Sequence, residues 1–133
     1  MTEPSSPTRQ SVRTDGAPAP IGPYSQAIIA NGFVYVSGQT PLDPATGEMI
    51  SGDIAAQTAR VLDSLDAILT AAGSSLRQVV KTTVFLHSMA DFAAMNAVYA
   101  TRFGDMPPAR STIGGLELPR GAQVEIEVVA LLG

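Results

Sequence analysis

The stretch Asp53–Gly73, DIAAQTARVLDSLDAILTAAG, decides the fold of this 133-residue chain, because it carries the clearest helical pattern. Asp53 stands where an N-cap residue belongs, and Gly73 follows the last apolar residue, as glycine commonly does at a helix end. The apolar residues recur at helical spacing and form one wide stripe: Ile54, Val61, Leu62, Leu65, Ile68, Leu69 and Ala72. We therefore predict a helix whose apolar stripe packs against another layer.

Two strand-forming segments precede this helix. Ser25–Ala30 and Phe33–Gly38 contain β-branched and aromatic residues, and Asn31-Gly32 separates them. Asn-Gly is typical of a tight hairpin turn, because both residues tolerate a positive φ. The following segment, Pro41–Gly52, contains DPATG at residues 43–47, which predicts a turn-rich loop.

The N-terminal part is rich in proline. Gly16–Tyr24 contains three prolines and two glycines, which excludes a helix or a central strand and predicts a stiff segment that holds Tyr24 in place. Gln10–Arg13 predicts a short strand. The polar composition of residues 1–11 predicts a disordered or loosely attached leader, and residues 12–133 are expected to form a single domain.

The segments after the long helix predict three strands and one further helix. Val79–His87, rich in valine, threonine and phenylalanine, predicts a buried strand. Ser88–Asp91 matches a capping box and predicts the start of a second helix that Gly104 ends. Ala109–Gly115 and Val124–Leu132 predict two more strands. One face of the second helix carries Phe92, Met95, Tyr99 and Phe103.

These elements predict an α+β fold, with about six strands in a mixed sheet and two helices packed on one face. In the last strand Val124, Ile126 and Val128 point to one side, while Glu125 and Glu127 point to the other. Only 15% of the residues are charged, whereas 45% are apolar. We therefore expect the sheet face that the helices leave uncovered to meet another copy of the chain.

The composition excludes several classes of protein. With a net charge of −4 and a single lysine, Lys81, the chain lacks the basic stripe of a nucleic-acid binder. It has no cysteine, which excludes disulfide scaffolds, thiolate nucleophiles and zinc–cysteine sites. No apolar run is long enough to span a membrane, and the N-terminus has no apolar signal segment. We expect a cytoplasmic protein with neither nucleic acid nor membrane as partner.

Few residues point to chemistry by themselves. His87 is the only histidine and no G-x-S-x-G motif is present, so we expect a structural histidine rather than a catalytic triad. The same scarcity of ligands predicts no metal site. Gly114-Gly115 is not a phosphate-binding loop and predicts a bulge or bend in its strand.

Arg110 and Glu125 are the remaining candidates. Arg110 lies on a predicted strand among small residues, where its guanidinium suits bidentate binding of a carboxylate. A salt bridge at the surface or between subunits is the alternative. Glu125 suits a general base or a group that orients water, and it equally suits a carboxylate paired with an arginine. Ser111 and Thr112 are ordinary strand residues by type. Both alternatives stay open from the residues alone.

Six short motifs follow one another along most of the chain. In this order they resemble the RidA (YjgF) family of reactive-intermediate deaminases, over about Ala17 to Leu132. The motifs are PIGPYSQA (20–27), VYVSGQ (34–39), GDIAAQT (52–58), VVKTTVFL (79–86), PARST (108–112) and LPRGAQVEIE (118–127).

The resemblance implies a chorismate-mutase-like fold and a homotrimer with sites between its subunits. It implies a 2-iminobutanoate/2-iminopropanoate deaminase of metabolite damage control. Such an enzyme hydrolyses reactive 2-imino and 2-enamine acids, such as 2-aminoacrylate, to 2-keto acids and ammonia without a cofactor. By the same resemblance Arg110 holds the substrate carboxylate and Glu125 orients or activates the attacking water. The other implied cleft residues are Tyr24, Ser37, Gly38, Asn96 and Thr112, the last through its backbone N–H.

Two further functions come from other classes. A non-catalytic trimer that binds or senses a keto acid or an amino acid would use the same arginine. Glu125 separates this alternative from the deaminase, because a pure binding protein has less need of it. An RNA-cleaving or protein-holding role conflicts with the acidic charge.

Overall fold

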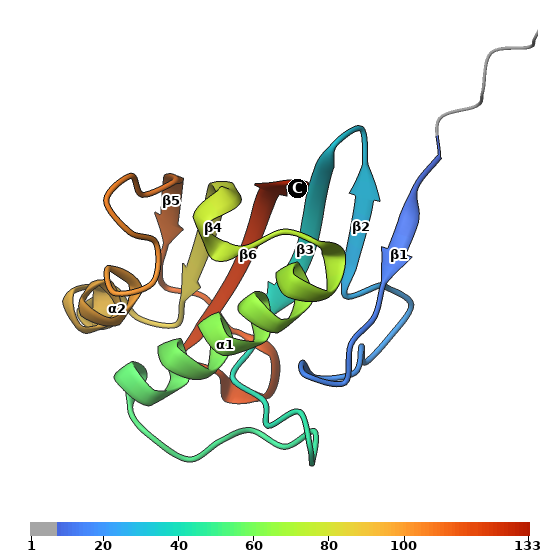
Figure 1. Cartoon of the computed structure of the whole chain (residues 1–133). Helices are drawn as coiled ribbons and strands as arrows, with labels where there is room; N and C mark the ends of the chain where they lie inside the picture. Colours follow the sequence, from blue (N-terminus) through green and yellow to red (C-terminus); the bar gives the residue numbers. More distant parts are fainter. Residues whose placement is uncertain (1–7) are drawn as a thin grey trace, which may run out of the picture.

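A six-stranded mixed sheet forms the centre of the computed structural model, which describes residues 8–133 (Figure 1). Its strand order is β1-β2-β3-β6-β4-β5, and only the neighbours β4 and β5 run parallel. Helices α1 (Ile54–Ala72) and α2 (Phe92–Tyr99) pack on one face, which confirms the predicted α+β architecture. The strands are β1 (Gln10–Val12), β2 (Ala27–Ala30), β3 (Phe33–Gln39), β4 (Val79–Leu86), β5 (Ala109–Ile113) and β6 (Val124–Leu131).

Helix α1 has the predicted ends. The Asp53 carboxylate accepts a hydrogen bond from the Ala56 N–H at 3.0 Å, and Gly73 adopts a φ of 86°. The predicted apolar stripe is buried against the sheet. Gln57 is also buried, and its side-chain oxygen accepts from the Gln123 N–H at 2.9 Å. This bond fastens the start of α1 to the residue before β6, close to Glu125.

The hairpin between β2 and β3 is also confirmed. Asn31 and Gly32 have φ values of 51° and 80°, as a tight two-residue turn requires. Ala30 pairs with Phe33 directly across this turn. The register places Val34 and Val36 on the helix-covered face of the sheet, so Tyr35 and Ser37 point to the other face.

The proline-rich segment before β2 is held by one buried side chain, Gln26. Its amide oxygen accepts from the Thr14 N–H at 2.7 Å, and its amide nitrogen donates to the carbonyls of Thr14 and Pro18 at 3.0 Å each. At the far end of the segment the Tyr24 hydroxyl accepts from the Ile21 N–H at 3.1 Å. The segment is therefore fixed by hydrogen bonds as well as by its prolines.

The second helix is shorter than predicted. Ser88 caps a 3₁₀ turn, Met89–Asp91, and α2 proper runs only from Phe92 to Tyr99 instead of reaching Gly104. The Thr101 hydroxyl donates to the Val98 carbonyl at 2.7 Å, so a side chain takes up one of the carbonyls at the helix end. The chain continues to Gly104 in turns, which bring the buried Phe103 ring against Tyr99.

Several strand limits also differ from the prediction. Strand β5 ends at Ile113, two residues early, because Gly114 lies against Met89 and Gly115 adopts a φ of 74°. The glycine pair is thus the predicted bend. Strands β4 and β6 each end one residue early, at Leu86 and Leu131.

At the other end of the sheet, β1 begins at Gln10, inside the segment predicted as a leader. It pairs with β2 through the backbone, and its Val12 side chain joins the hydrophobic core. Residues 1–7 of that predicted leader lie outside the described residues.

The two faces of the sheet differ as the alternation in β6 predicts. Val124, Ile126 and Val128 are buried beneath the helices, while Glu125 and Glu127 point away from them. On this uncovered face Tyr35 and Leu131 are each close to half exposed. Across residues 8–133, no helix is long and apolar enough to cross a membrane.

Candidate functional site

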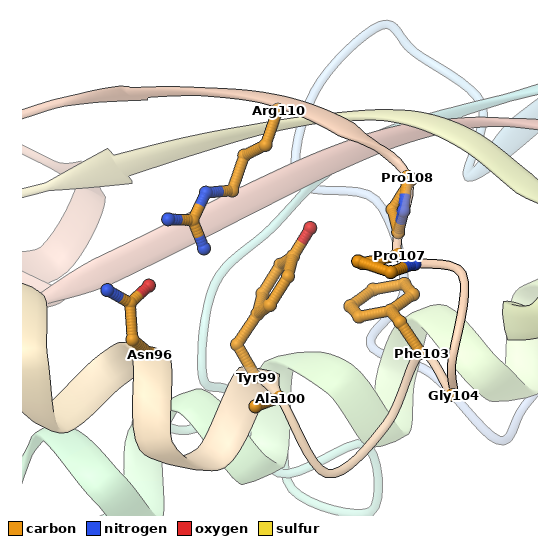
Figure 2. A pocket seen from close by; sticks show the side chains of 8 residues that line it. All are labelled: Asn96, Tyr99, Ala100, Phe103, Gly104, Pro107, Pro108 and Arg110. Carbon is orange, nitrogen blue, oxygen red and sulfur yellow. The ribbon is translucent and has the colours of Figure 1, made fainter.

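Arg110 lies on the edge strand β5 and reaches over helix α2 (Figure 2). It pairs with Thr82 of β4, whose side chain is buried on the helix-covered face, so Arg110 points to that face as well. Its guanidinium carbon lies 4.7 Å from the centre of the Tyr99 ring and 5.5 Å from that of Phe92. Arg110 makes no salt bridge to any residue of 8–133. The salt bridge that the sequence left open as an alternative role for Arg110 is therefore not found within these residues.

The pocket around this guanidinium has a volume of about 370 Å³ and mostly apolar walls. Its one carboxamide belongs to Asn96, whose side-chain oxygen is buried without a hydrogen-bond partner in the described part of the chain. The pocket thus combines an unpaired cation with an unpaired acceptor. We call it the arginine pocket, and it is lined by Asn96, Tyr99, Ala100, Phe103, Gly104, Pro107, Pro108 and Arg110.

Tyr99 anchors this pocket to the sheet. Its hydroxyl lies 2.8 Å from the hydroxyl of Thr82, the residue that pairs with Arg110 across the strands. Burial raises the pKa of Tyr99, against the opposing effects of the Thr82 hydrogen bond and of the Arg110 charge. The phenol therefore stays neutral, and its ring keeps the electron-rich face that attracts a cation.

Glu125 lies in a second pocket on the uncovered face, formed between β3, β6 and the loops beside them. This pocket has a volume of about 490 Å³. We call it the glutamate pocket, and it is lined by Ile21, Tyr24, Ser37, Gly38, Thr40, Leu42, Pro119, Arg120 and Glu125.

Glycine at position 38 makes room for the Glu125 carboxylate. A Cβ built on Gly38 would collide with the side chain of Glu125, so this carboxylate rests directly on backbone. Partial burial raises the pKa of Glu125, and the nearby charge of Glu127 raises it further. Among residues 8–133 no arginine or lysine forms a salt bridge with it. Glu125 is therefore a carboxyl group that accepts a proton more readily than an ordinary glutamate.

The remaining predicted site residues divide between these surfaces. Tyr24, Ser37 and Gly38 line the glutamate pocket, and Asn96 lines the arginine pocket. The Ser37 hydroxyl donates to the Ser25 carbonyl at 2.6 Å, which fixes its position. Thr112 points to the same face as Arg110 but lines neither pocket.

His87, predicted to be structural, is exposed, and its Nδ1 lies 2.8 Å from the Leu116 carbonyl oxygen. It lines neither of the two pockets. Its contact links the end of β4 to the chain after β5 and is consistent with a structural role.

Arg110 and Glu125 do not meet within one chain. Arg110 points to the helix-covered face, as does its strand partner, the buried Thr82. Glu125 points to the opposite face, because it lies between the buried Val124 and Ile126 in β6. The two side chains that the sequence pairs in one site therefore occupy separate pockets on opposite sides of the sheet.

Sequence reasoning missed the parts played by three further residues. Tyr99 and Phe92 were predicted to share one face of a helix, which is correct, but nothing in their spacing links them to Arg110. Arg120 lines the glutamate pocket and donates to the Gly47 carbonyl at 2.7 Å, with an unusual positive φ of 57°. Such a contact across 73 residues leaves no local signal in the sequence.

The fold and the site define a class of protein: a small α+β protein with a pocket around Arg110 and a pocket around Glu125 on opposite faces of one sheet. The family model described as Endoribonuclease L-PSP matches residues 14–132. The chain therefore belongs to this family, the YjgF/RidA family, as its motifs predict.

Relatives and solved structures agree with this assignment. A RutC family protein of Pyrococcus horikoshii is 51% identical over 92% of this chain and 97% of its own length. The 2-iminobutanoate/2-iminopropanoate deaminase of Mus musculus is 44% identical over 97% and 96%. A crystal structure of E. coli TdcF with bound serine superposes with a TM-score of 0.88, at 35% identity over 93% and 99% of the two chains.

Proposed function

We propose that this protein hydrolyses reactive 2-imino acids and their enamine forms to 2-keto acids and ammonia. The observation that carries the proposal is Arg110, which has no acidic partner among residues 8–133 and lies in a largely apolar pocket. Such a guanidinium suits bidentate binding of a substrate carboxylate. The mouse deaminase, at 44% identity, supports this reaction class, and the serine bound to E. coli TdcF supports a ligand of amino-acid size.

The chemistry needs both pockets, so we propose that neighbouring copies in a homotrimer join them. Each of three clefts would combine the arginine pocket of one copy with the glutamate pocket of the next, as a closed ring of head-to-tail contacts allows. The half-exposed Tyr35 and Leu131 on the uncovered sheet face support contact with another copy. In this arrangement Arg110 and Glu125 must point in opposite directions, because each side chain serves a different cleft.

The proposed reaction adds one water to a carbon–nitrogen double bond. Arg110 holds the carboxylate, and Asn96 lines the same pocket beside it. Glu125 takes a proton from water as the water oxygen bonds to C2, and the C=N electron pair moves to nitrogen. Glu125 then returns this proton to nitrogen, which gives an adduct with a hydroxyl and an amino group on C2. Glu125 next takes the hydroxyl proton and passes it to nitrogen as the C2–N bond breaks, so that ammonia leaves and the C2=O bond forms. An enamine substrate first takes up a proton at C3 and loses one from nitrogen, and so becomes the imine.

The test generates 2-iminobutanoate or 2-aminoacrylate with a dehydratase and follows the release of keto acid. The wild-type protein is expected to accelerate release at catalytic concentrations, and Arg110→Ala is expected to abolish the acceleration while the oligomer stays intact. Arg102→Ala is the matched control, because Arg102 is bound to Asp63 at 2.9 Å, away from both pockets. Failure of the wild-type protein to accelerate release would contradict the proposal.

A non-catalytic binding protein is the second candidate, favoured by the same unpaired arginine. It predicts that 2-ketobutyrate binds to the wild-type protein while the rate of imine hydrolysis stays unchanged. An outcome of this kind would assign the arginine pocket to ligand sensing instead of catalysis.

A further inference from the structure

We propose that Tyr99 and Phe92 are positioning residues, forming an aromatic platform that holds the guanidinium of Arg110 ready for a carboxylate. The inference rests on the proposed function, because it concerns how the arginine pocket binds its anion. It starts from the 4.7 Å and 5.5 Å distances between the guanidinium carbon and the two ring centres. Both distances lie within the range of cation–π contacts.

The helical repeat of α2 places the two rings of the platform side by side. Phe92 and Tyr99 are seven residues apart, which is about two turns of α2, so their rings line the same side of the helix. Strand β5 then runs parallel to β4 above this side and brings Arg110 over both rings. Helix α2 and the edge strand β5 thus determine where the guanidinium of Arg110 lies and which way it points.

Tyr99 is itself held firmly. It is only 6% exposed, it shares a hydrogen bond of 2.8 Å with Thr82, and its ring lies 4.5 Å from that of Phe103. Because Thr82 is also the strand partner of Arg110, the ring and the arginine backbone are fixed to the same point of the sheet. The ring cannot move without breaking this buried hydrogen bond.

An aromatic ring and an acidic side chain would both hold Arg110, but they leave different parts of its guanidinium free for the ligand. An aspartate or glutamate would hold Arg110 by neutralising its charge and would occupy the fork that a substrate carboxylate needs. A neutral ring attracts the cation through its face and leaves the N–H groups at the edge of the guanidinium available. The platform therefore orders the arginine side chain before binding and keeps its full charge for the ligand.

A purely structural role for these rings makes a different prediction, and Met95 separates the two. Met95 is fully buried on α2, between Phe92 and Tyr99 in the sequence, and it lines neither pocket. Truncation of Met95 removes core packing beneath the same helix. If packing alone matters, Met95→Val and Tyr99→Leu affect the pocket alike.

The experiment titrates 2-ketobutyrate into the oligomeric protein by calorimetry and compares five variants, of which Arg110→Ala is expected to lose binding. We expect Tyr99→Leu to raise Kd about tenfold and Phe92→Leu about threefold, in the order of their distances from the guanidinium. Tyr99→Phe keeps the ring, so its Kd stays within about threefold of wild type, although loss of the buried hydroxyl pair lowers its Tm. Met95→Val is expected to lower Tm with a Kd within about twofold of wild type. In the deaminase assay Tyr99→Leu raises KM by the same factor as Kd and changes kcat little.

Four outcomes overturn the inference. Wild-type affinity in Tyr99→Leu, while Arg110→Ala loses binding, rejects the platform and leaves the carboxylate site in place. An equal loss of affinity in Met95→Val and Tyr99→Leu assigns the effect to packing. Wild-type affinity in Arg110→Ala rejects the proposed carboxylate site itself, and the platform with it. Should Tyr99→Leu fail to fold, unchanged affinity in Phe92→Leu would reject the platform, because Phe92 is only partly buried.

Discussion

The arginine pocket and the glutamate pocket lie on opposite faces of one sheet and are lined by different kinds of residue. Aromatic and proline side chains wall the arginine pocket, and its cation has no anion within residues 8–133. Backbone glycine and hydroxyl groups shape the glutamate pocket, whose carboxylate has no cationic partner in the same part of the chain. Arg110 and Glu125 thus each lack a salt-bridge partner in these residues, and a ligand that contacts both side chains at once would need more than one copy of the chain.

The largest effect is expected from the glutamate pocket. Glu125→Gln keeps the size of the side chain but removes the proton acceptor, so kcat for imine hydrolysis should fall by about 10²–10³-fold. The affinity for 2-ketobutyrate should stay within a few-fold, because Arg110 remains. Steady-state kinetics and calorimetry measure the two quantities, and a large loss of affinity with unchanged kcat would mean that Glu125 only binds.

The pH dependence sharpens the role of Glu125. Its pKa is raised above the ordinary 4.5, and the proposed base must be ionised. The value of kcat/KM should therefore fall as pH decreases through this raised pKa, at a pH above 4.5. A pH–rate profile that stays flat down to the ordinary glutamate range would exclude Glu125 as the base.

The same shift has a consequence for stability. Between the ordinary and the raised pKa the folded state binds more protons than the unfolded state, so this contribution to stability is lost as pH rises through that window. Glu125→Gln removes the ionisation, and its Tm at neutral pH should exceed that of the wild type. Thermal melts at acidic and neutral pH check the sign. A difference in Tm between the two proteins that does not change with pH would contradict it.

A smaller effect is expected at Gly38, where the backbone contacts the Glu125 carboxylate. In Gly38→Ala the new methyl group displaces the Glu125 carboxylate, and kcat should fall about tenfold, as misplaced catalytic groups lose much of their effect. In the Glu125→Gln background the same substitution should change kcat little, since the group it displaces no longer acts. Equal losses in both backgrounds would show that Gly38 acts independently of Glu125.

Arg120 should give the smallest effect. Both Arg120→Gly and Arg120→Ala lose the hydrogen bond to Gly47, but only glycine relieves the positive φ of 57°. The glycine variant should therefore be more stable than the alanine variant by about 1 kcal/mol in urea unfolding. Equal stability of the two variants would indicate that the left-handed backbone at Arg120 carries no strain.

The sequence predicted the fold well, because local rules determine most of it. The caps at Asp53 and Gly73, the Asn31-Gly32 turn and the alternation around Glu125 each depend on neighbouring residues. The shorter α2 was missed because a capping motif shows where a helix begins but not how far it runs.

The candidate site was harder to predict than the fold. The direction of Arg110 depends on its pairing with Thr82 in a parallel register, and the spacing of the residues does not show that register. The contacts of Arg110 with Tyr99 and Phe92 follow from that pairing. Of the residues that the resemblance places in the site, Tyr24, Ser37, Gly38 and Glu125 line one pocket, Asn96 and Arg110 line the other, and Thr112 lines neither. The motifs did not show that one chain keeps Arg110 and Glu125 apart.

Subunit complementation tests most directly whether the two pockets form one site across neighbouring copies. Arg110→Ala and Glu125→Gln, each inactive alone, are co-expressed with different tags, and oligomers that contain both variants are purified and assayed. In a ring of three copies that contains both variants, one of the three clefts joins an intact Arg110 to an intact Glu125, so about a third of wild-type deaminase activity should return. Mixed oligomers that remain as inactive as the single variants would contradict a site shared between subunits.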